Sequence, residues 1–212
     1  MKQLERLVAE KLLKIKAIKV QPENPFTWAS GWKSPIYCDN RKTLSYPDIR
    51  TFIKIQIASI IAERYEDVDV IAGVATGAIA QGALVAEELG KPFVYVRSAP
   101  KDHGLENVIE GDLKPNQKVV VVEDLVSTGQ SSLKAVEALR KDGCDVIGMV
   151  AIFTYGFPIA TARFKKAGVE LTTLSNYEEV LEHLLKEKLI TEADKATLSE
   201  WRKTPDTWGK EA

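Results

Sequence analysis

The residue types with the most specific chemistry in this chain lie together in the stretch VVVVEDLVSTGQSS, residues 119–132. Four valines run into two adjacent carboxylates, Glu123 and Asp124, and then into small hydroxyl residues with one glycine. The valines predict a buried strand, and a helix is expected from about Ser131. Backbone N–H groups at the start of a helix are unpaired and lie at the positive end of the helix dipole. We therefore expect a phosphate to bind at this turn.

The ligand of this turn must also explain the two carboxylates, which would repel a phosphate. The hydroxyl side chains add donors, and Gly129 lets the backbone come close to an oxyanion. Neither the Walker A pattern nor the GxGxxG dinucleotide pattern is present, so a phosphate monoester fits better than a triphosphate. A ribose 5-phosphate satisfies both halves, because carboxylates bind vicinal hydroxyls or a Mg²⁺ that those hydroxyls help to hold. The alternative is that Glu123 and Asp124 only cap the end of a buried strand.

Short apolar runs alternate with helical stretches in the middle of the chain, which predicts βαβ units. The expected strands are 68–74, 93–96, 119–122, 146–153 and 169–174, and the expected helices are 79–89 and about 131–141. This alternation predicts an α/β fold with a parallel sheet covered by helices on both faces. Ligands of such sheets bind at the carboxyl ends of the strands. Three polar segments share that edge: ATGA after the first strand, VRSAPKDHG after the second and EDLVSTGQS after the third.

The two ends of the chain are organised differently from this middle part. Residues 2–17 predict an amphipathic helix, and the stretch 21–41, rich in Pro, Gly and aromatics, predicts a loop or short irregular strands. Ser45 is expected to cap a helix that runs to about Tyr65, and Ser175 to precede two C-terminal helices. Three parts result: 1–45, a core at 46–174, and C-terminal helices with a tail at 175–212.

The charge balance excludes a general attraction to polyanions. There are 29 Lys and Arg residues against 30 Asp and Glu residues, so any anion site must be local, and neither nucleic acid nor a membrane surface is an expected partner. The N-terminal stretch lacks the apolar core of a signal peptide, and no run approaches the roughly 18 apolar residues of a membrane span. A cytoplasmic location is expected. Cys38 and Cys144 are expected to be plain buried side chains.

The stretch 119–132 resembles the phosphoribosyl diphosphate (PRPP) signature of type I phosphoribosyltransferases. Two further segments, FTWASGWKSPIYCDNR (26–41) and VRSAPKDHG (96–104), resemble the orotate phosphoribosyltransferase family. The resemblance implies the α/β fold of type I phosphoribosyltransferases with a base-binding hood segment at 26–41. It also implies transfer of the 5-phosphoribosyl group from PRPP to orotate, with Mg²⁺ held mainly by PRPP rather than by a protein metal site. A transferase for adenine, xanthine or uracil and a non-enzymatic PRPP sensor remain as alternatives.

The same resemblance assigns roles to individual residues. The acid pair binds the ribose hydroxyls, the turn holds the 5-phosphate, and Ser127 also contacts orotate, on whose ring Tyr37 is expected to stack. Arg97, Lys101 and His103 are the expected catalytic residues, on a 97–104 loop that closes over the diphosphate and acts across the interface of a homodimer. The expected PRPP-binding residues are Arg97, Lys101, His103, Glu123, Asp124, Leu125, Val126, Ser127, Thr128, Gly129, Gln130 and Ser131.

A lid is also expected from the residues themselves, because 98–116 has little periodicity, and structureless connections of this length are usually lids, binding loops or disorder. The chain departs from the family at several positions. Many members have lysine where this chain has Ala29, Gly77 and Ser98, and Thr154 stands where an arginine contacts orotate. The orotate carboxylate is left without an assigned cation, for which Lys33 and Arg41 are candidates.

Overall fold

The centre of the protein is a six-stranded sheet in the spatial order β10-β9-β8-β5-β6-β7. The computed structural model describes residues 2–28, 31–98 and 108–209. Neighbouring strands run parallel except at one edge, where β7 pairs antiparallel with β6. The predicted parallel sheet is therefore confirmed, with one antiparallel edge strand added. The strands are β5 Val70–Val74, β6 Phe93–Val96, β7 Ile109–Glu110, β8 Lys118–Val126, β9 Asp145–Thr154 and β10 Leu171–Asn176.

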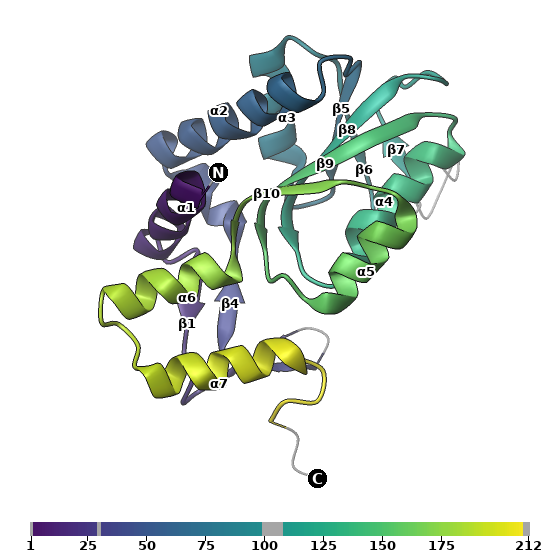
Figure 1. Cartoon of the computed structure of the whole chain (residues 1–212). Coiled ribbons are helices and arrows are strands. Elements are labelled where there is room, and N and C mark those ends of the chain that lie inside the picture. The colour runs from purple at the N-terminus through teal and green to yellow at the C-terminus, as the bar shows by residue number, and fades with distance from the viewer. Residues whose placement is uncertain (1, 29–30, 99–107, 210–212) are drawn as a thin grey trace.

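Helices cover both faces of this sheet (Figure 1), as the alternation of strands and helices predicts. On one face lie α2 (Pro47–Arg64) and α3 (Ile79–Leu89), and on the other lie α4 (Gln130–Lys141) and α5 (Pro158–Ala167). The α3 helix ends at Gly90, whose φ of 62° is the left-handed conformation typical of a helix C-terminus. The α5 helix had no counterpart among the sequence predictions. The valines 119–122 are fully buried between the two helical layers.

Strand β8 is longer than the valine run predicts. It continues through Val126, because Glu123, Leu125 and Val126 keep their pairing with β9. Its pairing with β5 stops at Val122. The two carboxylates therefore belong to the last part of a strand that has a neighbour on one side only, and not to the turn that follows.

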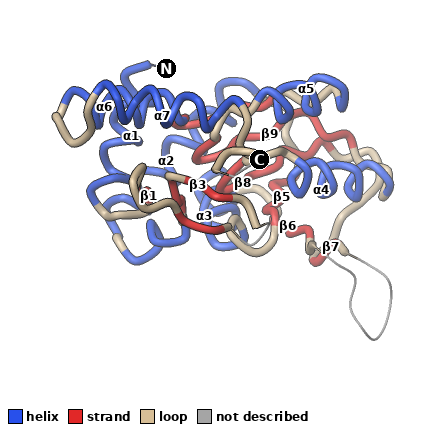
Figure 2. Tube along the Cα trace, turned by 90° about the horizontal axis from the view of Figure 1, so that it is seen from below, coloured by secondary structure: helices blue, strands red, loops and turns tan. Residues whose placement is uncertain are grey.

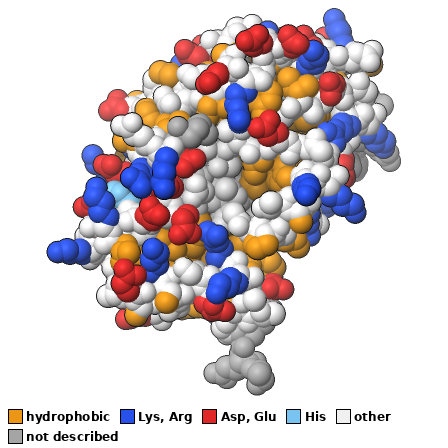
Figure 3. Space-filling model, viewed as in Figure 1, with side chains coloured by type: hydrophobic (Ala, Val, Ile, Leu, Met, Phe, Trp, Pro, Cys, Tyr) orange, Lys and Arg blue, Asp and Glu red, His pale blue; other side chains and the backbone are white. Residues whose placement is uncertain are grey.

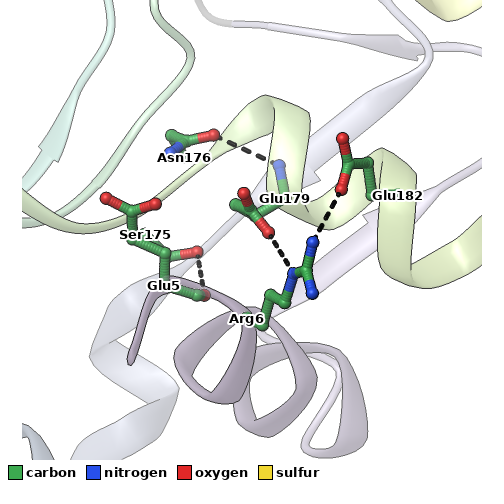
Figure 4. Close-up of polar contacts among 6 residues, drawn as sticks. All are labelled: Glu5, Arg6, Ser175, Asn176, Glu179 and Glu182. Atoms are coloured by element: carbon green, nitrogen blue, oxygen red, sulfur yellow. Dashed lines mark hydrogen bonds and ion pairs between the residues drawn. The ribbon is translucent and has the colours of Figure 1, made fainter. Parts of the chain in front are cut away.

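Both serines expected at the start of helices have other roles. Helix α2 begins at Pro47 after Tyr46, while Ser45 ends the short 3-10 helix η1 (Asn40–Ser45). Helix α6 (Tyr177–Lys186) is capped by Asn176, whose side chain accepts a hydrogen bond from the Glu179 amide. The hydroxyl of Ser175 instead donates to the carbonyl of Glu5 in α1 (Lys2–Lys14), at 2.8 Å (Figure 4). The residue before each helix is thus one position after the expected serine, and only in α6 does its side chain form a capping bond.

The N-terminal and C-terminal parts pack together at the end of the sheet where α6 and α7 (Glu192–Lys203) lie (Figures 1 and 2). Arg6 of α1 forms ion pairs with Glu179 at 3.2 Å and Glu182 at 3.4 Å on α6 (Figure 4). The strands of the N-terminal part form two small antiparallel pairs. These strands are β1 Ile18–Val20 with β4 Ile36–Cys38, and β2 Phe26–Thr27 with β3 Lys33–Ser34.

An aromatic cluster around Trp201 joins three parts of the chain. Trp201 of α7 is fully buried, and its ring lies 5.7 Å from Trp28 of the hood segment and 5.8 Å from Tyr155 after β9. Its indole N–H donates to the carbonyl of Lys33 at 3.1 Å. Aromatic packing of this kind buries a large apolar area and fixes ring geometry. The C-terminal helix therefore holds the hood segment in place against the core.

The charges of the visible surface are mixed. On the face seen in Figure 3, acidic and basic side chains alternate, in keeping with the near-neutral composition. Within the described ranges, none of the helices has the length and apolarity needed to span a membrane.

Candidate active site

A pocket of about 500 Å³ lies at the carboxyl ends of β5 and β8, where the parallel arrangement predicts a ligand site. Three segments line it. The hood segment contributes Cys38, Asp39 and Arg41, and the turn after β5 contributes Ala75, Thr76 and Gly77. The third segment is the end of β8 with its turn, which contributes Glu123, Asp124, Leu125, Ser127, Thr128 and Ser131.

A second pocket of about 330 Å³ adjoins the first, because both share Val74, Ala75, Thr128 and Ser131 in their walls. It extends toward the end of β6 and the first turns of α4. Its polar lining residues are Arg97, Ser98, Thr128, Gln130, Ser131 and Lys134. The sequence reading overlooked Lys134, which lies one turn inside α4 and supplies a cation to this pocket.

Glu123 is buried, and both of its carboxylate oxygens accept hydrogen bonds from the protein. The Ser132 hydroxyl donates to Oε2 at 2.8 Å, and the backbone N–H of Asp124 donates to Oε1 at 3.0 Å. Burial raises the pKa of Glu123 well above its usual range, and the neighbouring Asp124 raises it further. Ser132 was not among the predicted site residues. The pair of serines at 131–132, directly after the turn, was the feature of the sequence that could have pointed to it. Glu123 thus anchors the strand end more than it faces the pocket.

Asp124 is partly exposed, and its carboxylate lies against the turn after β5. A β-carbon added to Gly77 would overlap this carboxylate. Burial raises the pKa of Asp124, while hydrogen bonding with Glu123 and the charge of Arg41 act in the opposite direction. Gly77 is therefore required by the position of Asp124, and the lysine that many family members have there has no room while Asp124 stays in place.

The hood segment reaches the acid pair through Asn40, which was not among the predicted site residues. Its side-chain N–H donates to the carbonyl of Asp124 at 2.6 Å. Arg41 lines the first pocket and pairs with Asp39 at 2.6 Å. Lys33 lines neither pocket and donates to the Thr27 hydroxyl at 2.9 Å. Of the two cations considered for the orotate carboxylate, the geometry brings Arg41 to the site and leaves Lys33 outside it.

The other predicted residues differ in how close they come to the two pockets. Val126 is directed into the core, and its carbonyl accepts from the Tyr155 amide, so it lines neither pocket. Tyr37 is 39% exposed and packs on Phe26, also outside both linings. Arg97 lines the second pocket, with its guanidinium 3.5 Å from Glu110. Three positions discussed from the sequence, Ala29, Lys101 and His103, lie outside the described residues.

Helix α5 contacts the hydroxyl-lined turn 127–131. The Arg163 guanidinium donates to the carbonyl of Thr128 at 2.9 Å. Gly129 has a φ of 75°, and a β-carbon there would lie 2.9 Å from the Phe164 ring. Glycine is needed at this position for its left-handed backbone and for close packing on α5. The turn is thus held in shape by a helix that the sequence patterns did not predict.

The donors at the pocket suit a magnesium ion that is shared with a ligand. Carboxylate and hydroxyl oxygens are the hard donors that Mg²⁺ prefers, and Asp124 is the partly exposed member of the acid pair in the pocket wall. In the described part of the chain there is no group of three or more His, Cys, Asp or Glu residues able to hold a metal ion.

The sheet, the paired acids and the hydroxyl-lined turn are arranged as in a type I phosphoribosyltransferase. In agreement, the model of the phosphoribosyl transferase domain matches residues 48–186. Similar proteins of known name show which phosphoribosyltransferase family this is. An orotate phosphoribosyltransferase of Phocaeicola vulgatus is 70% identical over 208 residues, which is 98% of each chain, and one of Porphyromonas gingivalis is 65% identical over 209 residues, covering 99% of this chain and all of the relative. The chain belongs to the orotate phosphoribosyltransferase family.

Solved structures agree with this assignment at the level of the fold. The orotate phosphoribosyltransferase from Aeropyrum pernix superposes with a TM-score of 0.75 at 28% identity, covering 87% of this chain and 99% of that one. The UMP synthase of Leishmania donovani superposes with a TM-score of 0.77 at 27% identity, covering 93% of this chain and 42% of that one.

Proposed function

We propose that the protein transfers the 5-phosphoribosyl group of PRPP to orotate, giving orotidine 5′-phosphate and diphosphate. The observation that carries this proposal is the meeting, in one pocket, of the Asp124 carboxylate, the hydroxyl-lined turn 127–131 and hood residues 38–41. These parts suit the ribose hydroxyls, the 5-phosphate and the base of the two substrates. Because the family members named above are orotate phosphoribosyltransferases, orotate is the base that we propose.

In the proposed complex, the backbone N–H groups and hydroxyls of 127–131 hold the 5-phosphate. Asp124 accepts from the ribose hydroxyls, and Glu123 keeps the strand end rigid behind it. The diphosphate extends toward the turn 75–77 and Arg97, whose guanidinium suits a bidentate contact. Asp124 together with the ribose hydroxyls and diphosphate of PRPP would hold a Mg²⁺ ion, which would offset the negative charge of the diphosphate.

The reaction is a displacement at the anomeric carbon of the ribose. The bond to the diphosphate oxygen breaks and its electron pair leaves with the diphosphate, while a ring nitrogen of orotate supplies the pair for the new bond and its N–H proton is released to the departing diphosphate or to water. No covalent intermediate with the protein is needed. The protein contributes positioning and electrostatics, since a positively charged ribosyl centre must be held between nucleophile and leaving group.

For the base end, we propose Arg41 as the partner of the orotate carboxylate. Its guanidinium lines the pocket, and the present pairing with Asp39 would be exchanged for the substrate. Ser127 lines the same pocket and suits a contact with orotate. Stacking by Tyr37 stays a prediction and would require its ring to turn from Phe26 toward the pocket.

The proposal also includes a cytoplasmic location, a lid that both the aperiodic stretch 98–116 and the family resemblance favour, and a homodimer that rests on the resemblance. Lys101 and His103 would stabilise the departing diphosphate, and their loop would act in the neighbouring subunit. Mixing an inactive Lys101→Ala subunit with an inactive Asp124→Asn subunit tests this directly. Recovered activity in verified mixed dimers is expected, and no recovery would mean that the loop serves its own subunit.

The first test of the function is the fall in orotate ultraviolet absorbance with purified protein, PRPP and Mg²⁺. Adenine, xanthine and uracil are run beside orotate as competing bases. Consumption of orotate alone, dependent on PRPP, is the expected result. Consumption of another base would make the protein a different phosphoribosyltransferase, and PRPP binding without turnover would favour a sensor.

A further inference from the structure

Asn40 forms a buried link between the hood segment and the acid pair. It lies at the start of η1 with 1% of its surface exposed. Its side-chain nitrogen donates to the Asp124 carbonyl at 2.6 Å, and its side-chain oxygen accepts from the Cys38 thiol at 3.3 Å. Its own carbonyl accepts from the Thr43 hydroxyl at 2.6 Å. Both ends of the amide are therefore fixed in one orientation.

The contact involves a backbone group that the sheet does not pair. Strand β5 pairs with β8 only as far as Val122, so on that side Asp124 has no neighbouring strand. Two side chains bind the backbone of Asp124 in place of a neighbouring strand. The Glu123 carboxylate accepts from the Asp124 N–H, and Asn40 donates to the Asp124 carbonyl. An unpaired backbone carbonyl at such a site costs free energy, and a free strand end can rotate. The direction of the Asp124 carboxylate depends on these two contacts.

We infer that Asn40 is a positioning residue for PRPP: it holds the backbone of Asp124 so that the carboxylate faces the ribose hydroxyls. The inference rests on the function proposed above. Asn40 does not touch the substrate in this account and acts through Asp124. Because Asn40 and Arg41 are adjacent in the hood segment, the same link also keeps the base-binding side of the pocket at a set distance from the ribose-binding side.

A double-mutant cycle with PRPP binding as the readout tests this role. PRPP affinity is measured by calorimetry for the wild type, Asn40→Ala, Asp124→Ala and the double variant, and thermal unfolding is followed for each. Asn40→Ala should weaken PRPP binding by about tenfold. In the double variant the Asn40 change should add less than about twofold, because the carboxylate that Asn40 positions is already gone.

Two further variants separate positioning from a loss of stability. Ser175→Ala removes another buried hydrogen bond to a backbone carbonyl, at 2.8 Å from Glu5, and it lines neither pocket. It should lower the Tm while leaving PRPP affinity unchanged. Asn40→Asp keeps the volume but replaces the donor by an oxygen, so it should weaken PRPP at least as much as alanine; it carries the test if the alanine variant does not fold.

Unchanged PRPP affinity in the Asn40 variants would overturn the inference, and so would fully additive effects in the cycle or an equal loss in Ser175→Ala. These results differ from a failure of the proposed function itself. A failure of the proposed function appears in the wild type itself, which would bind no PRPP or would bind it without consuming orotate, whereas a failure of the inference leaves wild-type PRPP binding and orotate consumption intact.

Discussion

The carboxylate of Asp124 lies so close to the backbone of Gly77 that a β-carbon on residue 77 would overlap its oxygens. Asp124 lies near the end of β8, and Gly77 lies in the turn that follows the neighbouring parallel strand β5; both line the pocket. The carboxylate proposed for the ribose hydroxyls and the turn proposed for the diphosphate are therefore in direct contact. A substitution that enlarges residue 77 should therefore displace the Asp124 carboxylate, or be displaced by it.

Gly77→Ala should accordingly weaken PRPP binding by about tenfold or more, because either Asp124 or the turn has to move. The free energy of unfolding should fall less than the free energy of PRPP binding, since the carboxylate can shift into the open pocket. Ala80→Ser, which adds one atom on the exposed side of α3, is the control and should bind PRPP normally. Equal PRPP affinity in Gly77→Ala and the wild type would show that Asp124 does not need this position.

The Glu123 carboxylate predicts a particular dependence of stability on pH. Its pKa in the folded protein is raised by burial and by Asp124, while an unfolded Glu has a pKa of about 4.3. A raised folded pKa means that its contribution to stability is fully present below about pH 4.3 and is lost as pH rises through the folded value. In Glu123→Gln this loss should be absent, so the Tm of the variant relative to wild type should rise between pH 4 and pH 8.

The control for this prediction is Glu63→Gln, which removes an exposed carboxylate from α2. Gln at position 123 can still accept from the Asp124 N–H and can donate to the Ser132 hydroxyl, so the fold should be kept. If the Tm of Glu123→Gln and the Tm of the wild type changed with pH in the same way, the prediction of a buried, titrating Glu123 would be wrong.

Sequence reasoning found the five parallel strands of the sheet and most helices, because apolar periodicity is a local signal. The exact bounds of α3 and β6 agree with the prediction, and the acid pair and hydroxyl turn do line the pocket. The sequence patterns did not reveal the roles of Asn40, Ser132 and Arg163, and there is a physical reason for this. Each acts through a contact with a residue that only the fold brings near, such as the Asp124 carbonyl 84 positions away from Asn40. A single polar residue carries no periodicity that would reveal such a partner.

Arg163 should matter for phosphate binding although it lines neither pocket. Its hydrogen bond to the Thr128 carbonyl fixes the conformation of the turn 127–131, and its positive charge lies next to that turn but outside both pocket linings. Arg163→Ala should raise the KM for PRPP about threefold to tenfold, with a smaller effect on kcat. Arg140→Ala is a matched control, because Arg140 also donates to a backbone carbonyl, that of Ala167, but away from the turn. Equal KM changes in the two variants would show that the contact to Thr128 has no special role.

Trp201 should set the affinity for the base from a distance. Its indole N–H holds the Lys33 carbonyl at 3.1 Å, and its ring packs on Trp28, so it fixes the strands from which the hood segment is built. Trp201→Phe keeps most of the apolar area but removes the donor, which leaves the Lys33 carbonyl without this bond and should cost about 0.5–1.5 kcal/mol of stability. The KM for orotate should rise while PRPP affinity stays near the wild-type value, since the turn 127–131 is held by α5 instead. Trp208→Phe, in the half-buried C-terminal stretch, controls for the loss of an indole. A rise in the KM for PRPP equal to that for orotate would mean that Trp201 supports the whole pocket and not the hood segment in particular.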